Sequence, residues 1–162
     1  MESERAYELA YKYEAKYGGC AQTTLAAIFE VLNVDAKDVF KSVTGLAGGI
    51  GVIGDGTCGA VVAGVIALSY FFGREYENFS DPERKRFETY KLAREFYQRF
   101  KKIFGSTRCH DIQRRLMGRE FDLLDPKDWE DFLKAGGHDD KCPSVTGTAA
   151  KIAVEMILER LK

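Results

Sequence analysis

Hydrophobic and polar positions repeat at helical spacing along most of the chain. In the first segment, Ala6, Leu9, Ala10 and Tyr13 fall three or four residues apart, the spacing that places side chains on one face of an α-helix. Later segments repeat this pattern, and the β-branched residues lie inside them rather than in alternating strand-like runs. The pattern predicts helices over residues 3–16, 20–32, 35–43, 58–72, 82–104, 106–117, 125–136 and 143–161.

These segments predict an all-α protein, a single-domain helical bundle of about seven to eight helices that covers residues 1–162. The segment 58–72 is apolar nearly all round, which is typical of a central, buried helix. A glycine-rich loop over residues 45–59 precedes it. Pro82 is expected at the first position of its helix, where the missing N–H costs nothing.

Charge and hydropathy indicate which partners and which cellular location to expect. The net charge is -1 and charged residues make up 30% of the chain, which predicts no attraction to nucleic acid or to an anionic membrane. The longest apolar run, residues 60–72, is shorter than the roughly 18–20 residues of a membrane-spanning helix. Met1 to Arg5 lack the basic and then apolar layout of a signal peptide. We therefore expect a cytoplasmic protein, whose thiols stay reduced.

The four cysteines are the main candidates for chemistry. Each falls at or near the start of a different predicted helix, at Cys20, Cys58, Cys109 and Cys142. The positive end of a helix favours thiolate over thiol and lowers the cysteine pKa. Four thiolates gathered at one point would form the ligand set of an iron–sulfur cluster or of a structural zinc ion. No Cys-x-x-Cys pair is present, and the spacing alone leaves four buried apolar thiols, or a disulfide, open.

The segment Cys58-Gly59-Ala60-Val61-Val62-Ala63, with one cysteine before it and two after it, resembles a family of redox-active proteins named for their C…CGAxxG…C…C pattern. The resemblance covers about Tyr7 to Leu158. It departs from the pattern at Ala63, where the last glycine of the motif belongs and Gly64 follows instead. A similar four-cysteine domain occurs fused to the split-Soret type of cytochrome c.

This resemblance implies a helical domain with a redox role and an iron–sulfur cluster, foremost a [2Fe–2S] cluster, on Cys20, Cys58, Cys109 and Cys142. The function predicted is electron transfer or redox sensing, with an unidentified redox protein as partner. Two alternatives stay open. One is a thiol–disulfide oxidoreductase that uses a pair such as Cys58 with Cys20. The other is a helical binding domain with a structural zinc ion. Whether the protein is an enzyme, and whether it forms a homodimer, is also left open.

Three further signals receive structural interpretations. Gly49 to Gly54 spell GxGxxG, but no predicted strand flanks them, so we interpret the loop as a backbone wrap close to Cys58. His110 and His138 are expected at the surface, as histidine often is. Charged residues on the predicted helix 82–104 are interpreted as a solvated face. Its aromatic side chains are expected in the core, namely Phe87, Tyr90, Phe96, Tyr97 and Phe100.

Overall fold

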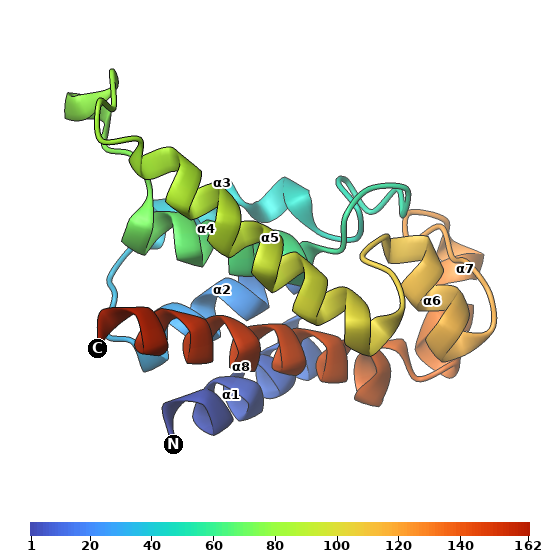
Figure 1. The fold of residues 1–162 in the computed structure, drawn as a ribbon. Helices are drawn as coiled ribbons and strands as arrows, with labels where there is room; N and C mark the ends of the chain where they lie inside the picture. Colours follow the sequence, from blue (N-terminus) through green and yellow to red (C-terminus); the bar gives the residue numbers. More distant parts are fainter.

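The computed structural model describes residues 1–162, which form eight α-helices and no strand (Figure 1). The fold class predicted from the sequence is therefore confirmed. The helices are α1 (Glu2–Tyr17), α2 (Cys20–Val31), α3 (Lys37–Ser42), α4 (Gly59–Phe72), α5 (Lys85–Phe104), α6 (Cys109–Met117), α7 (Pro126–Lys134) and α8 (Cys142–Leu161). Short 3₁₀ turns over Thr44–Leu46 and Tyr76–Asn78, and a π-helical turn over Gly137–Lys141, lie in the connections.

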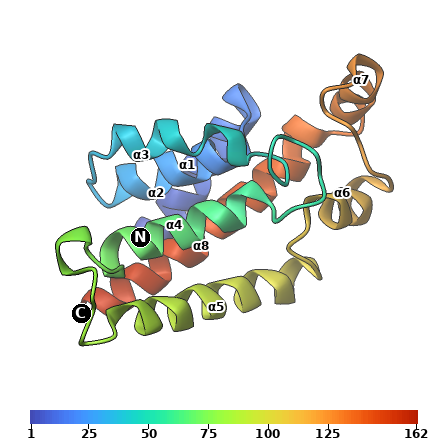
Figure 2. The same cartoon turned by 90° about the horizontal axis from the view of Figure 1, so that it is seen from above.

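The helices of the bundle run in directions that bring several N-termini to one end. α1 and α8 are antiparallel, since the Thr146 hydroxyl donates to the Ala10 carbonyl and Lys151 pairs with Glu4. α2 returns along α1, and it runs parallel to α4, with the Phe29 and Tyr70 rings 5.1 Å apart near their far ends. α2, α4 and α8 therefore all begin at the same end of the bundle (Figures 1 and 2).

Small residues on α4 let its neighbours approach closely. Ala60, Ala63 and Ala67 are fully buried, and α4 packs against α2, α5 and α8 as a central helix. Gly64 lies against the fully buried ring of Phe96 on α5, so closely that a Cβ atom there would overlap the ring. Gly64, one residue after the position where the sequence-based pattern expects a glycine, is therefore the glycine that the contact with α5 requires.

Helix α5 begins later than the sequence predicts. The helix begins at Lys85. The Asp81 carboxylate caps this start, because it accepts the N–H groups of Lys85 and Arg86 at 2.8 and 3.1 Å. Those two N–H groups belong to the first turn of the helix and have no partner within it. Pro82 lies in the preceding turn rather than at the first helical position.

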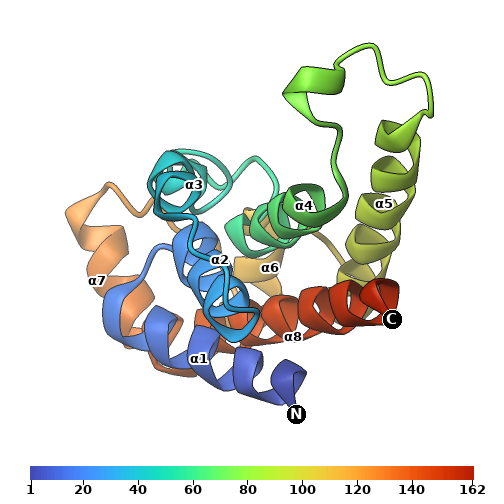
Figure 3. The ribbon, with the colours of Figure 1, turned by 90° about the vertical axis from the view of Figure 1, so that its left-hand side faces the viewer.

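Only part of the aromatic face of α5 is core. Phe96 and Phe100 are fully buried, whereas Phe87, Tyr90 and Tyr97 are 36%, 56% and 39% exposed. The reason is geometric: the segment before α5 and the first turns of α5 stand away from the rest of the bundle (Figure 3). The expectation that all these rings are core is wrong for Phe87 and Tyr90 in these first turns. It is also wrong for Tyr97 farther along the helix, whose hydroxyl accepts a hydrogen bond from Thr107 Oγ1. No helix of the protein is both long enough and apolar enough to cross a bilayer.

We expect Gly64→Ala to lower the free energy of unfolding by about 1–3 kcal/mol, because the added Cβ forces the Phe96 ring or the α5 backbone to shift. Gly45→Ala is the matched control. Gly45 is exposed, and no atom lies within 4 Å of the position its Cβ would take, so its change should stay within about 0.5 kcal/mol. Chemical denaturation of both variants measures the difference, and equal stabilities would contradict the close-packing role of Gly64.

Candidate functional site

The four cysteines mark the starts of four helices and line one cavity. Cys20, Cys109 and Cys142 are the first residues of α2, α6 and α8, and Cys58 is the N-cap of α4. All four contribute to the wall of a single cavity of about 260 Å³. The structure therefore brings the cysteines together where the helix pattern suggested. Their role as ligands stays a prediction.

Cys20 and Cys58 are immediate neighbours, and Gly59 makes this possible. A Cβ atom on residue 59 would lie 2.5 Å from Cys20 Sγ and 2.9 Å from the Ala21 nitrogen. Only glycine leaves room there for the sulfur of the adjacent helix. Cys20 Sγ therefore lies directly against the start of α4, next to Cys58. The glycine directly after Cys58 thus places the first two cysteines of the chain side by side.

The glycine-rich loop connects Cys58 to Cys109. The backbone N–H of Cys109 donates to the Gly56 carbonyl at 3.1 Å, and the N–H of Cys58 donates to the Thr107 carbonyl at 2.7 Å. The N–H of Gly48, also in this loop, donates to Cys20 Sγ at 3.3 Å. The loop is therefore a backbone wrap against the cysteine cavity, as expected. No strand flanks its GxGxxG sequence, so it lacks the structural context of a dinucleotide fingerprint.

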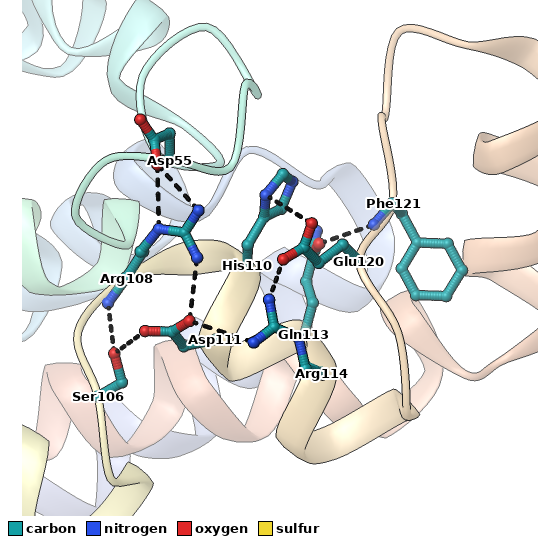
Figure 4. A network of polar contacts seen from close by, with 9 residues as sticks. All are labelled: Asp55, Ser106, Arg108, His110, Asp111, Gln113, Arg114, Glu120 and Phe121. Carbon is teal, nitrogen blue, oxygen red and sulfur yellow. Dashed lines mark hydrogen bonds and ion pairs between the residues drawn. The ribbon is translucent and has the colours of Figure 1, made fainter.

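A polar network holds this loop against α6 (Figure 4). Arg108 binds Asp55 of the loop at 2.9 Å and Asp111 of α6 at 3.0 Å. Ser106 completes the corner, since its hydroxyl accepts from the Arg108 N–H and donates to Asp111. Partly exposed ion pairs of this kind contribute little stability each. Their effect here is positional, because Arg108 directly precedes Cys109 and fixes the start of α6 against the loop.

Both histidines are less exposed than expected, and only one lines the cavity. The His110 side chain is 16% exposed; it packs on Gly54, and its Nδ1 lies 3.4 Å from Glu120. The His138 side chain is 22% exposed, and it packs edge-on against the rings of Trp129 and Phe132. His138 also belongs to the cavity wall. The prediction of surface positions is wrong because α7 and the glycine loop cover the two rings, and these contacts are distant in sequence.

Glu14 is a cavity residue that sequence reasoning missed. Its side chain is 3% exposed, and it accepts a hydrogen bond from Thr23 Oγ1 at 2.7 Å. Burial raises the pKa of Glu14 to about 7, and burial also lowers the pKa of His138, whose Nε2 lies 3.5 Å away. Near pH 7, Glu14 is therefore only about half ionised and His138 is largely neutral, so the two groups do not form a full ion pair. A signal was present: Glu14 continues the buried stripe of Ala6 and Ala10 at four-residue spacing.

The thiol pKa values move opposite to the expected direction. The hydrogen bond with Cys58 and then burial raise the pKa of Cys20, and burial raises the pKa of Cys109 to about 12. Burial, followed by the nearby Glu14 carboxyl, raises the pKa of Cys142. Helix N-termini favour thiolates, but here the apolar wall and the neighbouring acidic groups outweigh them. These three thiols are protonated at neutral pH.

The side chains that could bind a metal lie around the cavity and do not converge on a single position. No three His, Cys, Asp or Glu side chains lie close enough together to hold one metal ion. The four sulfurs belong to the cavity wall together with apolar residues such as Val52, Ile112 and Val145. The site is thus a chamber with four thiols on its wall, and four helix starts of an all-α protein hold these thiols.

Residues 19–156 match the family described as "Putative redox-active protein (C_GCAxxG_C_C)". The chain belongs to this family, and all four cysteines fall within the matched residues. The pattern in the family's name is not literal around Cys58, which Thr57 precedes and Gly59-Ala60 follow. No curated protein and no solved structure matches the chain. The similarity to the split-Soret domain therefore stays a prediction.

We expect the stability of the metal-free protein to depend on Glu14 between pH 4.5 and 7. Because folding raises the Glu14 pKa from 4.5 to about 7, the folded state binds this proton more tightly than the unfolded state. The contribution is therefore full below pH 4.5, falls as the pH rises, and is lost above pH 7. A shift of this size corresponds to about 3 kcal/mol.

The measurement compares the free energy of unfolding of the wild type and Glu14→Gln across this range of pH. The wild type should lose stability relative to the variant as the pH rises, by about 3 kcal/mol in total. His138 is present in both proteins, so its opposing titration largely cancels in the difference. A difference that stays constant with pH would show that Glu14 titrates normally.

Proposed function

We propose that this protein transfers electrons or senses redox state through an iron–sulfur cluster, foremost [2Fe–2S], held by Cys20, Cys58, Cys109 and Cys142. The observation that carries the proposal is the convergence of four cysteines, each from a different helix start, on one cavity. Four cysteine sulfurs are the usual ligand set of such clusters. When bound, a cluster of this kind supplies reversible one-electron chemistry, which a redox protein partner would use.

The electrostatics of the chamber suit a cationic iron centre. The thiols of Cys20, Cys109 and Cys142 are protonated at neutral pH, because Cys58 and then burial raise the pKa of Cys20, and burial raises the pKa of Cys109 and of Cys142. Metal ions at such a site deprotonate thiols and neutralise the resulting charge. The helix starts then favour the remaining negative charge. The Gly48 N–H already points at Cys20 Sγ, and hydrogen bonds to ligand sulfurs are one factor that sets a cluster's potential.

The spacing of the donors favours a cluster over a structural zinc ion. A zinc ion needs four ligands within about 2.3 Å of a single centre, whereas no three donor side chains of this protein surround one such point. A cluster distributes its ligand positions over two or more iron atoms and so accepts a wider ring of sulfurs. The apolar wall would also shield the bound group from water, which tunes its potential.

A second candidate function rests on the contact between Cys20 and Cys58. These two thiols lie at adjacent helix starts, and a two-electron oxidant could join them in a disulfide, with loss of one proton from each thiol. The raised pKa of Cys20 argues against efficient thiol–disulfide exchange, because the thiolate is the nucleophile. We therefore rank this function second.

Replacement of any one cysteine by alanine should reduce the iron content and the visible absorption of anaerobically purified protein by about tenfold or more, since each thiolate is one of four ligands. Ser144→Ala is the matched control for Cys142→Ala. It removes a similarly small polar side chain from the same first turn of α8, outside the cavity wall. Its iron, sulfide and absorption should equal those of the wild type.

The outcomes separate the candidates. Brown wild-type protein with iron and labile sulfide, lost in all four cysteine variants, supports the proposal. Full absorption in the Cys142→Ala protein would contradict the four-ligand site. If colourless wild type resists anaerobic reconstitution and a mild oxidant removes two thiols, at Cys20 and Cys58, the disulfide function takes its place.

Gly59→Ala should also lose most of the iron although all four cysteines remain. The added Cβ would lie 2.5 Å from Cys20 Sγ, so the sulfur must leave its position at the start of α4. We expect the iron content to fall about fivefold or more, because ligand geometry is specific. Gly45→Ala, in open space, serves as the control. Wild-type iron content in a folded Gly59→Ala protein would show that the Cys20 position is not required.

A further inference from the structure

The cavity extends well beyond the four cysteines. One face of α6 lines it from end to end, at Cys109, Ile112, Gln113, Leu116 and Met117. A rise of 1.5 Å per residue places Met117 about 12 Å from Cys109 along the helix axis. Cys20, Cys58 and Cys142 all lie at helix starts, together with Cys109. Met117 therefore lies at the end of α6 that is far from Cys109 and carries no cysteine.

This remote end is apolar and partly aromatic. We define it by six residues of α6, α7 and their connection: Leu116, Met117, Leu123, Leu124, Trp129 and Phe132. α6 and α7 lie together at one end of the bundle, beyond the start of α8 (Figure 2). The Trp129 and Phe132 rings are stacked, with centroids 5.7 Å apart. Aromatic rings and a methionine thioether both make favourable contacts with another ring.

The polar side chains on the cavity wall are already engaged within the protein. Gln113 Oε1 accepts the Phe121 N–H at 3.0 Å (Figure 4), Thr146 donates to the Ala10 carbonyl, and Glu14 accepts from Thr23. No lysine or arginine lines the cavity. An anionic ligand would lose its hydration without gaining an opposite charge, which is costly. A neutral ligand has no such cost.

We propose that the remote end of the cavity binds a small neutral aromatic molecule. The whole chamber measures about 260 Å³, and since an apolar cavity of about 150 Å³ holds benzene, the chamber has room for one small aromatic molecule. Bound there, the molecule lies against Trp129 on the same chamber as the thiols. This inference goes beyond the proposed cluster and does not require it, because the remote end is formed by the protein alone.

The test titrates the metal-free full-length protein with 2-acetylnaphthalene, a neutral aromatic ketone that does not alkylate thiols. Trp129 is the sole tryptophan of the chain, so its fluorescence reports binding at the remote end, and calorimetry gives the stoichiometry. We expect saturable binding of one molecule per chain. Met117→Asp should weaken the affinity by about tenfold or more, since it places a charge on the apolar wall.

Leu133→Asp is the matched control, because Leu133 lies near the end of α7, is 40% exposed and does not line the cavity. Its affinity should stay within about twofold of wild type. Leu124→Asp, at a 78% exposed position of the wall, decides the matter if Met117→Asp fails to fold, and should weaken binding at least about threefold. Absence of saturable binding, or wild-type affinity in the folded wall variants, would overturn the proposal.

The proposed cluster and this ligand site can fail separately. A colourless protein that binds the ketone at the remote end would support the ligand site and contradict the iron–sulfur cluster. A brown protein that binds no ketone, with or without its iron, shows that the apolar end only insulates the cysteines. Binding that is abolished when the protein carries iron would place the ring at the cysteine end and would also overturn the second proposal.

Discussion

The contact between the start of α2 and the start of α4 is the constraint on which the cysteine site depends. Gly59 lies so close to Cys20 Sγ that a single added carbon would displace the sulfur. This contact fixes the α2 and α4 starts beside each other, and the antiparallel packing of α1 with α8 brings the start of α8 to the same end. Cys109 is held at this end in a different way, by backbone hydrogen bonds between the glycine loop and the start of α6.

This arrangement sets two electrostatic effects against each other. Four helix starts supply partial positive charge, which favours thiolates. The same convergence buries the sulfurs in an apolar wall beside one another and beside Glu14, and burial has the larger effect on the pKa values of Cys109 and Cys142. A chamber with these properties keeps its thiols neutral until a cation enters, which is consistent with a site whose loading and folding stabilise each other.

Most of the fold could be predicted from the sequence because helical periodicity is a local property. The starts of α2, α4, α6 and α8 follow from glycine, proline and apolar spacing, and they place the four cysteines correctly. Positions that depend on tertiary packing could not be predicted. The exposed rings of Phe87 and Tyr90 follow from how far α5 extends past the bundle. The buried histidines follow from helix and loop contacts that are distant in sequence, and Glu14 was hidden within an otherwise charged helix.

The division of the cavity into a cysteine end and an apolar end bears on how a redox centre at this site would be used. If the apolar residues served only as insulation, the expected filling would be close-packed side chains, because protein interiors rarely leave large voids. Instead, Leu116, Met117 and Trp129 line open space. An open apolar chamber beside a redox group would give a small neutral molecule access to it while anionic solutes stay outside. The open apolar end is thus better suited to admit a small neutral molecule than to serve as insulation alone.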